Sequence, residues 1–512
     1  MMAQGAASPT IESGEILDLL IVGGGINGAG IARDAAGRGL TVALVEKGDL
    51  AQGTSSRSSR LIHGGLRYLE YGEFRLVREA LHEREILLSA APHLVRPIKF
   101  VLPHVAGMRP AWMLRAGLYF YDHLARRRRL AASAPIALDR APEGEPLRPE
   151  IRRGFTYADC RTDDVRLVVH NAVAAAALGA KILTGCELVH AGAHDGLWKA
   201  ELRDARKGAV RSLQARVLIN AAGPWVEDVA PRIAGVRRAH HARLVKGSHV
   251  VVRKFWSGDH GYLLQNVDRR VVFVTPYEDD WALIGTTDIA FSSSPDAVAI
   301  SPGEVRYLLD AVNRQLRRAL ASEDIVYAFS GVRCLVDDEK SDPSAVTRDY
   351  RIEAATSAQH PPAITVLGGK ITTYRRLAEH VLELLKPHFP RMRAAWTAQA
   401  RLPGGDFPDP DFNAAQRRFV EESAFLPPAH ARGLLARHGT VAYRMLAGVR
   451  TREAMGQHFG AGLYERELRH LVEHEWARTS DDVLWRRTKF GLRLSAEQIR
   501  ALDQWMAAAT LA

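Results

Sequence analysis

Basic side chains beside glycine turns are the residues of this sequence best suited to bind a small anion. Arg333 lies in "FSGVRCL", Arg348 in "TRDY", and Lys370 follows two glycines and precedes a predicted helix in "LGGKITTYRRLAEH". Guanidinium groups bind phosphate through paired hydrogen bonds, and free N–H groups at a helix start attract negative charge. A surface salt bridge explains each arginine better when it is taken alone. Together with Arg67 of "HGGLRYLE", they predict a pocket for a small dianion.

One histidine is placed where it could move a proton. His249 lies in "LVKGSHVVV", a segment that reads as a strand. A single histidine in a strand is more often a core or surface residue, but in a redox pocket a neutral imidazole is a suitable proton acceptor at neutral pH. Cys334, next to Arg333, is better explained by packing than by chemistry.

A glycine-rich loop directly follows a short run of apolar residues in "LLIVGGGINGAG". Gly23, Gly25 and Gly28 match the pattern G-x-G-x-x-G, in which the glycines allow a tight turn, close approach to a pyrophosphate, and close packing of helix on strand. A second predicted strand, "TVALVEK", ends at Glu46, at the distance expected for a partner of an adenosine ribose. The order of these features predicts an ADP-containing dinucleotide, and NAD, NADP and FAD all fit.

A second loop is expected beside the nucleotide because it leaves the same edge of the predicted sheet. "TSSRSSRLIHGGLRYLE", residues 54–70, contains hydroxyl groups, His63, Arg67 and two adjacent glycines. A solvated polar loop is the alternative interpretation. The paired glycines suit a close approach of the backbone to a ligand and favour a functional loop.

The segments that position these residues indicate three structural units. We expect a flexible tail at 1–15 and an α/β, Rossmann-like dinucleotide domain, discontinuous in sequence, at 16–400. Strand-like segments predict an antiparallel sheet inserted into it, roughly 236–335 with part of 95–160. "SPGEVRYLLDAVNRQL" has a capping box at its start. After the Pro- and Gly-rich "LPGGDFPDPDF", helical periodicity predicts an all-helical cap at 413–512.

Composition narrows the class of protein. Hydrophobic residues make up 47% of the 512, three widely spaced cysteines offer no disulfide framework or zinc site, and we expect no metal. The first residues show no secretory signal, and no apolar run reaches the roughly 18 residues of a spanning helix. A net charge of +11 suits an acidic substrate, an anionic lipid surface or nucleic acid. No nucleic-acid motif is recognisable, so we expect no nucleic-acid partner.

Aromatic residues precede a run of arginines in "YFYDHLARRRRL", with Trp112 and Met113 upstream and Arg126 to Arg129 at its end. This arrangement fits a helix that lies on an anionic membrane surface. A solvated charged turn fits it equally well.

These motifs resemble one family, the FAD-dependent glycerol-3-phosphate dehydrogenases of the aerobic, respiratory type. The resemblance covers nearly the whole chain, and the glycine-rich and Gly-Gly-Lys motifs are specific to that family. It implies FAD as cofactor, a D-amino-acid-oxidase-like fold, and oxidation of sn-glycerol 3-phosphate to dihydroxyacetone phosphate. It further implies ubiquinone as electron acceptor and peripheral attachment to the cytoplasmic face of the cell membrane. We leave a homodimer open. The segments that carry the resemblance are "IVGGGINGAGIARDAAGRGL", "TSSRSSRLIHGGLRYLEYGEFRLV", "LVKGSHVVV", "IGTTD", "FSGVR", "TRDY", "GGKITTYRRLAEH" and "LVEHEWARTSDDVLWRRTKFGL".

The resemblance also implies which residues form the substrate pocket: Arg67, His249, Arg333, Arg348 and Lys370. From the chemistry of alcohol oxidation we expect Arg67, Arg348 and Lys370 to hold the phosphate, Arg333 to stabilise the developing alkoxide, and His249 to accept the proton. Cys334 replaces a proline that the family usually has, so the backbone of that turn is expected to differ. The flavin contacts fall on Gly23, Gly25, Asn27, Gly28, Glu46, Ser55, Ser56, Ser59, Gly369 and Thr372.

Three other functions fit parts of the sequence. An oxidase of the same fold would pass electrons to oxygen and make peroxide. A D-amino-acid or sarcosine-type flavin oxidase would need a site for a carboxylate and an amine, whereas the cationic residues favour a phosphate. A nucleic-acid-binding flavoprotein rests on the basic charge alone.

Overall fold

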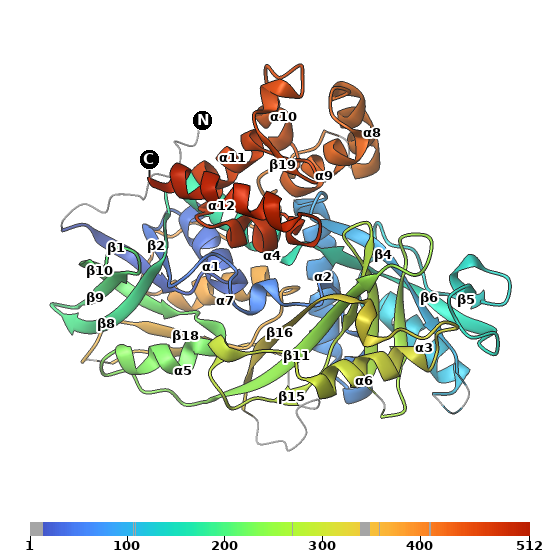
Figure 1. The fold of residues 1–512 in the computed structure, drawn as a ribbon. Helices are drawn as coiled ribbons and strands as arrows, with labels where there is room; N and C mark the ends of the chain where they lie inside the picture. Colours follow the sequence, from blue (N-terminus) through green and yellow to red (C-terminus); the bar gives the residue numbers. More distant parts are fainter. Residues whose placement is uncertain are drawn as a thin grey trace.

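The computed structural model describes residues 14–511 except 106, 108, 269, 338–348, 358, 409 and 410, and it describes no side chains at 510 and 511. Most of the predicted tail therefore lies outside the described residues. The polypeptide forms two large sheets and a C-terminal group of helices, which Figure 1 shows in red above α1 and α4. None of the described helices combines the length and the apolar character that a bilayer crossing requires.

The first sheet carries the predicted β-α-β unit. β1 pairs in parallel with β2 on one side and with β10 on the other, and the order along the sheet is β17-β18-β10-β1-β2-β7. Nearly every residue of β1 and β2 is buried because helices or other chain segments cover both faces, as is usual for a parallel sheet. Its strands are β1 Ile16–Val22, β2 Val42–Glu46, β7 Lys181–Thr184, β8 Cys186–His194, β9 Leu197–Asp204, β10 Val210–Asn220, β17 Arg351–Ala355 and β18 Ala363–Leu367.

Helices α1, α4 and α7 share one hydrophobic core with this sheet. Small side chains let α1 lie close to its neighbours; Gly30, for example, faces the ring of Tyr374 on α7. An alanine-rich segment forms α4, whose N-cap Asp163 accepts a hydrogen bond from the amide of Arg166. The helices of this part are α1 Ile26–Gly37, α4 Asp164–Ala177, the short α5 Val226–Val229, and α7 Tyr374–Leu385.

The second sheet is mainly antiparallel, as predicted, and it combines strands from 242–336 with strands from 95–162 and one short strand at 61–62. Its order is β15-β11-β14-β13-β12-β4-β6-β3, with β16 on β11 and β5 on β6. All its pairs are antiparallel except β12 with β4. The strands are β3 Leu61–Ile62, β4 Val95–Pro103, β5 Ala134–Ala137, β6 Arg153–Thr162, β11 Ala242–Arg253, β12 Gly261–Gln265, β13 Val271–Tyr277, β14 Trp281–Gly285, β15 Ile289–Ala290 and β16 Ile325–Val336.

Three helices accompany the second sheet: α2 Phe74–Ala90, α3 Ala111–His123 and α6 Pro302–Asn313. The capping box predicted at the start of α6 is present, with Ser301 and Glu304 bonded to each other's backbone amides. Glu304 also accepts hydrogen bonds from Ser248 and Thr287 on the sheet. The same carboxylate therefore caps the helix and ties it to the strands.

The C-terminal unit is helical, as expected, and adds a short hairpin formed by β19 and β20. Two small hydrophobic clusters form its interior, one around Phe419 and the other around Leu471. Its elements are α8 Phe412–Glu422, α9 Pro428–His438, α10 Val441–Met445, β19 His458–Gly460, β20 Leu463–Tyr464, α11 Glu465–Glu475, a π-helical turn Asp482–Arg487, and α12 Ala496–Leu511.

Candidate functional site

The glycine-rich loop connects β1 to α1 with a geometry that other residues would not tolerate. Gly23 has φ +112°, and a Cβ there would lie 2.5 Å from the carbonyl oxygen of Ala221. A Cβ on Gly28 would lie 1.9 Å from the carbonyl oxygen of Gly23. Gly25 immediately precedes α1. The backbone therefore brings the N-terminus of α1 against the end of the strand, the arrangement that binds a pyrophosphate.

Glu46 ends β2 beside this loop. Its carboxylate accepts hydrogen bonds from the amides of Gly24 at 2.7 Å and Gly48 at 2.9 Å. Burial raises the pKa of the carboxyl, and the two amides act in the opposite direction. A carboxylate has about four lone-pair directions, so two remain for the hydroxyl groups of a ribose.

The serine-rich loop lies across the start of α1, as predicted. Ser55 Oγ accepts a hydrogen bond from the amide of Ile26 at 3.0 Å, and Ser59 Oγ lies 2.9 Å from His249 Nε2. Ser56 donates instead to the carbonyl of Gly53 at 3.1 Å, and it is not among the described residues that line the cavity. Thr54, Arg57 and Ser58 do line it.

The Gly-Gly-Lys segment closes the cavity from the other side. Asn27 Nδ2 donates to the carbonyl of Gly368 at 3.2 Å, and a Cβ on Gly369 would lie 3.1 Å from the same amide nitrogen. The hydroxyl of Thr372 accepts a hydrogen bond from the amide of His63 at 3.3 Å. Asn27 Oδ1 is buried with no hydrogen-bond partner among the described residues. Such an acceptor is expected where a bound group supplies the missing donor.

These observations fit an ADP-containing dinucleotide such as FAD. The N-terminus of α1 suits the pyrophosphate, Glu46 suits the ribose, and Asn27 offers an unused acceptor inside the cavity. The cavity has a volume of about 730 Å³ and extends from the glycine-rich loop to the face of the second sheet. It is therefore continuous from the predicted cofactor contacts to the predicted substrate residues.

Arg333 and His249 lie on the same face of the second sheet. In the antiparallel pair of β11 and β16, Val245 is opposite Arg333 and His249 is opposite Phe329, so residues two apart along either strand share a face. Arg333 forms an ion pair with Asp288 and donates to Thr286 Oγ1 at 2.9 Å. Small residues leave the space: a Cβ on Gly247 would lie 2.4 Å from the Arg333 guanidinium.

His249 is almost completely buried, with 1% of its surface exposed. Its ring stacks on Phe329 with centroids 5.0 Å apart, and a Cβ on Gly285 would lie 2.1 Å from the imidazole. Burial, assisted by the positive charge of Arg333, lowers the pKa of His249 to about 3. The imidazole is therefore neutral at physiological pH, as the sequence analysis expected of a proton acceptor.

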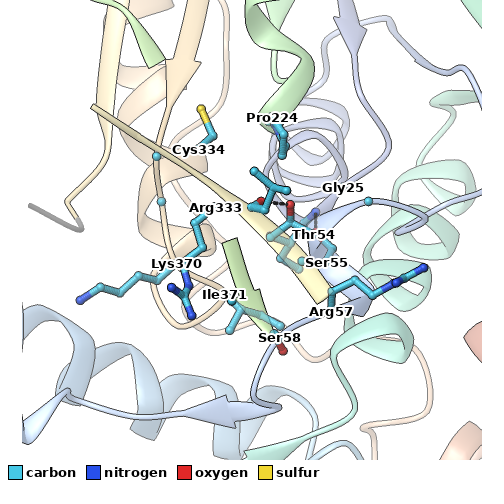
Figure 2. Close-up of a pocket in the computed structure, with 18 of the residues that line it drawn as sticks. Gly25, Thr54, Ser55, Arg57, Ser58, Pro224, Arg333, Cys334, Lys370 and Ile371 are labelled. Carbon is cyan, nitrogen blue, oxygen red and sulfur yellow. Dashed lines mark hydrogen bonds between the residues drawn. The ribbon is translucent and has the colours of Figure 1, made fainter. Parts of the chain in front are cut away.

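The remaining cationic residues form a second group. Lys370 Nζ lies 3.9 Å from the centre of the Tyr68 ring, and the neighbouring Arg67 donates to Tyr71 Oη at 3.3 Å. Figure 2 shows Lys370 extending away from Arg333. Both lysine and arginine line the cavity. Arg348, the fifth predicted substrate residue, lies outside the described residues.

Sequence reasoning missed the residues that hold these side chains. Asp288 and Thr286 fix Arg333, and the Tyr68 ring lies against Lys370. His63, which the sequence placed in the functional loop, lines the cavity with its ring centre 6.0 Å from that of Phe273. Thr286 and Asp288 belong to "IGTTD", a segment that carries the family resemblance. The adjacency of aspartate and two hydroxyl residues at a strand end was the available signal.

Comparison with known proteins agrees with this architecture. Residues 18–375 match the family described as FAD dependent oxidoreductase, and residues 395–510 match the C-terminal domain of alpha-glycerophosphate oxidase. The chain is 50% identical to D-erythritol 1-phosphate dehydrogenase of Brucella abortus, over 97% of this chain and 99% of that protein. It is 49% identical to glycerol-3-phosphate dehydrogenase of Pseudomonas aeruginosa, over 98% and 97% respectively.

A solved structure extends the agreement to the fold. The glycerol-3-phosphate dehydrogenase from Bacillus halodurans complexed with FAD has a TM-score of 0.77 and 27% identity, covering 98% of this chain and 92% of that one. The predicted cofactor, FAD, and the predicted fold class are thereby confirmed. The chain belongs to the family of FAD-dependent oxidoreductases that contains the aerobic glycerol-3-phosphate dehydrogenases.

Proposed function

We propose that this protein oxidises sn-glycerol 3-phosphate to dihydroxyacetone phosphate and passes the electrons through FAD to a membrane quinone. The observation that carries the proposal is one cavity that joins the dinucleotide site to two groups of cationic side chains. A phosphate monoester needs such cations, whereas an amino acid needs partners for both a carboxylate and an amine. FAD, when bound, supplies the two-electron acceptor chemistry.

Arg67 and Lys370 hold the substrate phosphate in this proposal. Lys370 lies over the ring of Tyr68, Arg67 contacts Tyr71, and both cations line the cavity. Arg348 completes the phosphate site, as the family resemblance implies. Binding energy from the phosphate fixes the carbinol carbon in place, although the phosphate itself does not react.

Arg333 stabilises the oxygen that becomes negatively charged as the alcohol loses its proton. Asp288 and Thr286 fix the guanidinium before substrate binds, so little reorganisation is needed during the reaction. His249 accepts the proton: it is neutral, and Ser59 fixes the orientation of its ring by the contact at Nε2. His249 Nδ1 is buried without a hydrogen-bond partner among the described residues.

D-erythritol 1-phosphate is the second candidate substrate. The relative from Brucella abortus is named for it and is as similar to this chain as the glycerol-3-phosphate dehydrogenase from Pseudomonas aeruginosa. Both compounds carry a phosphate and a secondary alcohol, and the tetritol has one more carbinol carbon. Arg109, Gln265 and Arg270 also line the cavity, and their polar groups suit an additional hydroxyl.

An anionic membrane surface and ubiquinone are the proposed partners. Helix α3 exposes 71% of Trp112, together with Met113, Tyr119 and Phe120. A basic groove lies at the end of the same helix, lined by Arg75, Arg78, His82, His123, Arg126 and Arg127 as well as Glu79 and Asp122. Exposed aromatic residues beside basic residues are typical of a helix that lies on anionic lipid.

The same helix also reaches the redox cavity. Leu114 of α3 lines the cavity, while its neighbours Trp112 and Met113 are exposed. A quinone dissolved in the bilayer could therefore approach the cavity along this helix. This supports contact between α3 and the membrane, and the cytoplasmic face is the side that the family resemblance implies.

The test is anaerobic reduction of the purified yellow protein, followed by the absorbance of the flavin at about 450 nm. We expect rapid bleaching by sn-glycerol 3-phosphate, and recovery by a ubiquinone analogue that is much faster than recovery by air. Faster bleaching by D-erythritol 1-phosphate would transfer the proposal to the second substrate. Bleaching by D-amino acids alone would contradict both, and rapid peroxide formation in air would identify an oxidase.

A further inference from the structure

The C-terminal helical unit contacts the turn that follows the ribose-binding strand. Arg487, which ends the π-helical turn Asp482–Arg487, donates from Nη1 and Nη2 to the two carboxylate oxygens of Asp49 at 2.7 and 2.8 Å. Arg486 Nε lies 2.5 Å from the same carboxylate. Asp49 is 7% exposed and Arg487 is fully buried. This is a paired, desolvated contact between residues far apart in sequence.

The turn held in this way is part of the cofactor site. Asp49 lies three residues after Glu46, and the intervening Gly48 donates its amide to the Glu46 carboxylate. The turn also packs on the glycine-rich loop: Ala51 donates to the carbonyl of Gly24 at 3.0 Å, and a Cβ on Gly24 would lie 2.8 Å from Glu46 Cβ. A displacement of Asp49 would therefore also move Glu46 and Gly24, because the turn is bonded to Glu46 through Gly48 and to Gly24 through Ala51.

Arg487 bonds both oxygens of the Asp49 carboxylate, whereas Arg486 reaches only Oδ2. Without Arg487, Oδ1 would lose this charged partner at a buried position, and the carboxylate would turn towards Arg486 or towards water. The main-chain amide of Asp49 donates to Gln52 at 2.9 Å, and Gln52 lines the cavity. Movement of the carboxylate would thus disturb the turn on both sides of the ribose position.

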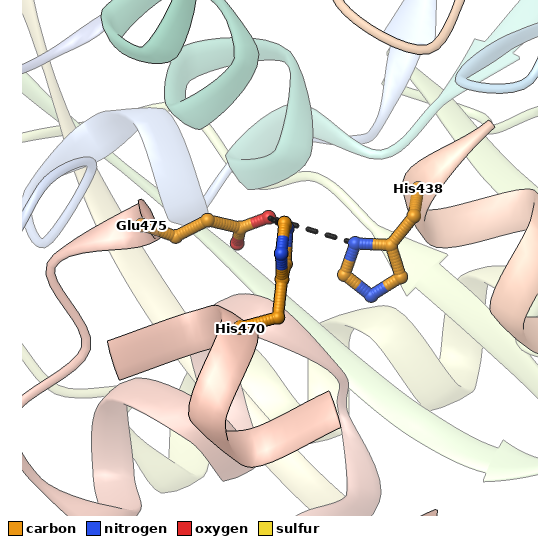
Figure 3. Close-up of side chains that lie close together, drawn as sticks. All are labelled: His438, His470 and Glu475. Carbon is orange, nitrogen blue, oxygen red and sulfur yellow. Dashed lines mark ion pairs between the residues drawn. The ribbon is translucent and has the colours of Figure 1, made fainter. Parts of the chain in front are cut away.

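A second contact between the same two units serves as the comparison. Arg166 on α4 forms an ion pair with Glu475 of α11, and its guanidinium also lies 3.2 Å from His438 Nδ1. Figure 3 shows Glu475 with His438 and His470, a set that has the composition of a metal site. The guanidinium of Arg166 already occupies the position of a cation against these atoms, and with the other charges it holds the pKa of Glu475 well below its usual range despite burial. We therefore assign this cluster to docking of the unit and not to metal binding.

We propose that Arg487 is a positioning residue for FAD: through Asp49 it holds the turn that presents Glu46 to the adenosine ribose. The C-terminal unit is thereby part of the cofactor site and does more than cover the fold. This inference depends on FAD as cofactor and not on the identity of the substrate.

The test compares FAD release from the purified holoenzymes of Arg487→Gln and Arg166→Gln. Both substitutions break a buried ion pair between the same two units. We expect FAD, followed by its fluorescence after dilution, to leave Arg487→Gln about tenfold faster than the parent protein, equivalent to about 1.4 kcal/mol. Arg166→Gln should melt at a lower temperature yet release FAD at a rate within twofold of the parent. The visible spectrum of bound flavin should be unchanged in both.

Two further variants keep the proposal testable if Arg487→Gln does not fold. Asp49→Asn removes the charge that Arg487 neutralises and should also release FAD about tenfold faster, since the amide pairs poorly with a guanidinium. Arg487→Lys restores the charge and should recover much of the slow release. Equal release rates from the Arg487 and Arg166 variants, or no change in Asp49→Asn, would overturn the proposal.

Discussion

Gly23, Gly25 and Gly28 shape one end of the cavity with backbone, whereas Arg333 and His249 shape the other end with side chains. At the glycine-rich end, a Cβ added to Gly23 or Gly28 would collide with a main-chain carbonyl group that cannot move aside. At the other end, Asp288, Thr286, Ser59 and Phe329 fix two chemically active groups on one sheet. Substitutions at the first end should therefore weaken FAD binding, whereas substitutions at the second end should slow the reaction while FAD stays bound.

The largest effect is expected from Arg333→Gln. The substitution removes a charge positioned near the reacting oxygen, and loss of one such group typically reduces the rate by about a hundred- to a thousandfold. We expect flavin reduction by the substrate to slow by about this factor with FAD content unchanged. Stopped-flow absorbance measures the first quantity and the ratio of flavin to protein the second.

Arg253→Gln is the matched control, because Arg253 ends the neighbouring strand β11 with its side chain exposed. It should reduce at the parental rate. Loss of FAD from Arg333→Gln would contradict the division between the two ends.

Gly28→Ala should have the next largest effect. The new methyl group would lie 1.9 Å from the carbonyl oxygen of Gly23, and forcing an extra group into close packing costs about 1–3 kcal/mol. We expect FAD affinity to fall by about ten- to a hundredfold, as measured by flavin titration. Gly117→Ala in α3, where a Cβ meets nothing within 4 Å, should bind FAD normally. A normal FAD affinity of Gly28→Ala would show that the loop can relax.

The smallest effect concerns pH. Since the pKa of His249 is lowered to about 3, the imidazole stays neutral as the pH falls from 8 to about 5. The second-order rate constant for flavin reduction should therefore not decline through an inflection at about 6.5, the ordinary histidine pKa. An inflection at about pH 6.5 that disappears in His249→Gln would contradict the conclusion that His249 is buried and neutral.

The same shift affects stability. The unfolded chain binds the proton of this histidine at its ordinary pKa of about 6.5, whereas the folded chain binds it only near 3. The unfolded state therefore takes up more protons between these values. The free energy of unfolding should fall as the pH decreases through this range, and denaturant titrations at several pH values would measure it.

The contrast between the two ends also explains what the sequence could predict. The glycine spacing and Glu46 lie within one β-α-β unit, so local spacing was enough to assign them. Arg333 could be singled out, but its partner Asp288 lies in the segment between β14 and β15, and no periodicity links the two. Glu304 combines both cases: its capping box with Ser301 was predictable, whereas its hydrogen bond to Ser248 was not.

The contacts of the C-terminal unit were the least predictable. Its helices follow from periodicity, but Asp49 and Arg487 come together only after the whole chain has folded. Buried ion pairs of this kind leave no pattern in a single sequence, because either partner alone resembles a surface charge.

The position of β1 between β2 and β10 has a consequence for the order of events during synthesis. The ribosome releases β1 early, yet one of its two neighbours, β10, is made only after β3 to β9 and α2 to α4, and the segment 368–372 that closes the cavity comes later still. The nascent chain therefore carries an apolar strand with an open edge until β10 has been made, and no complete flavin site until residue 372 has been made. We expect cofactor loading to come after that point, and a cell short of FAD should accumulate full-length apoprotein and not truncated chains.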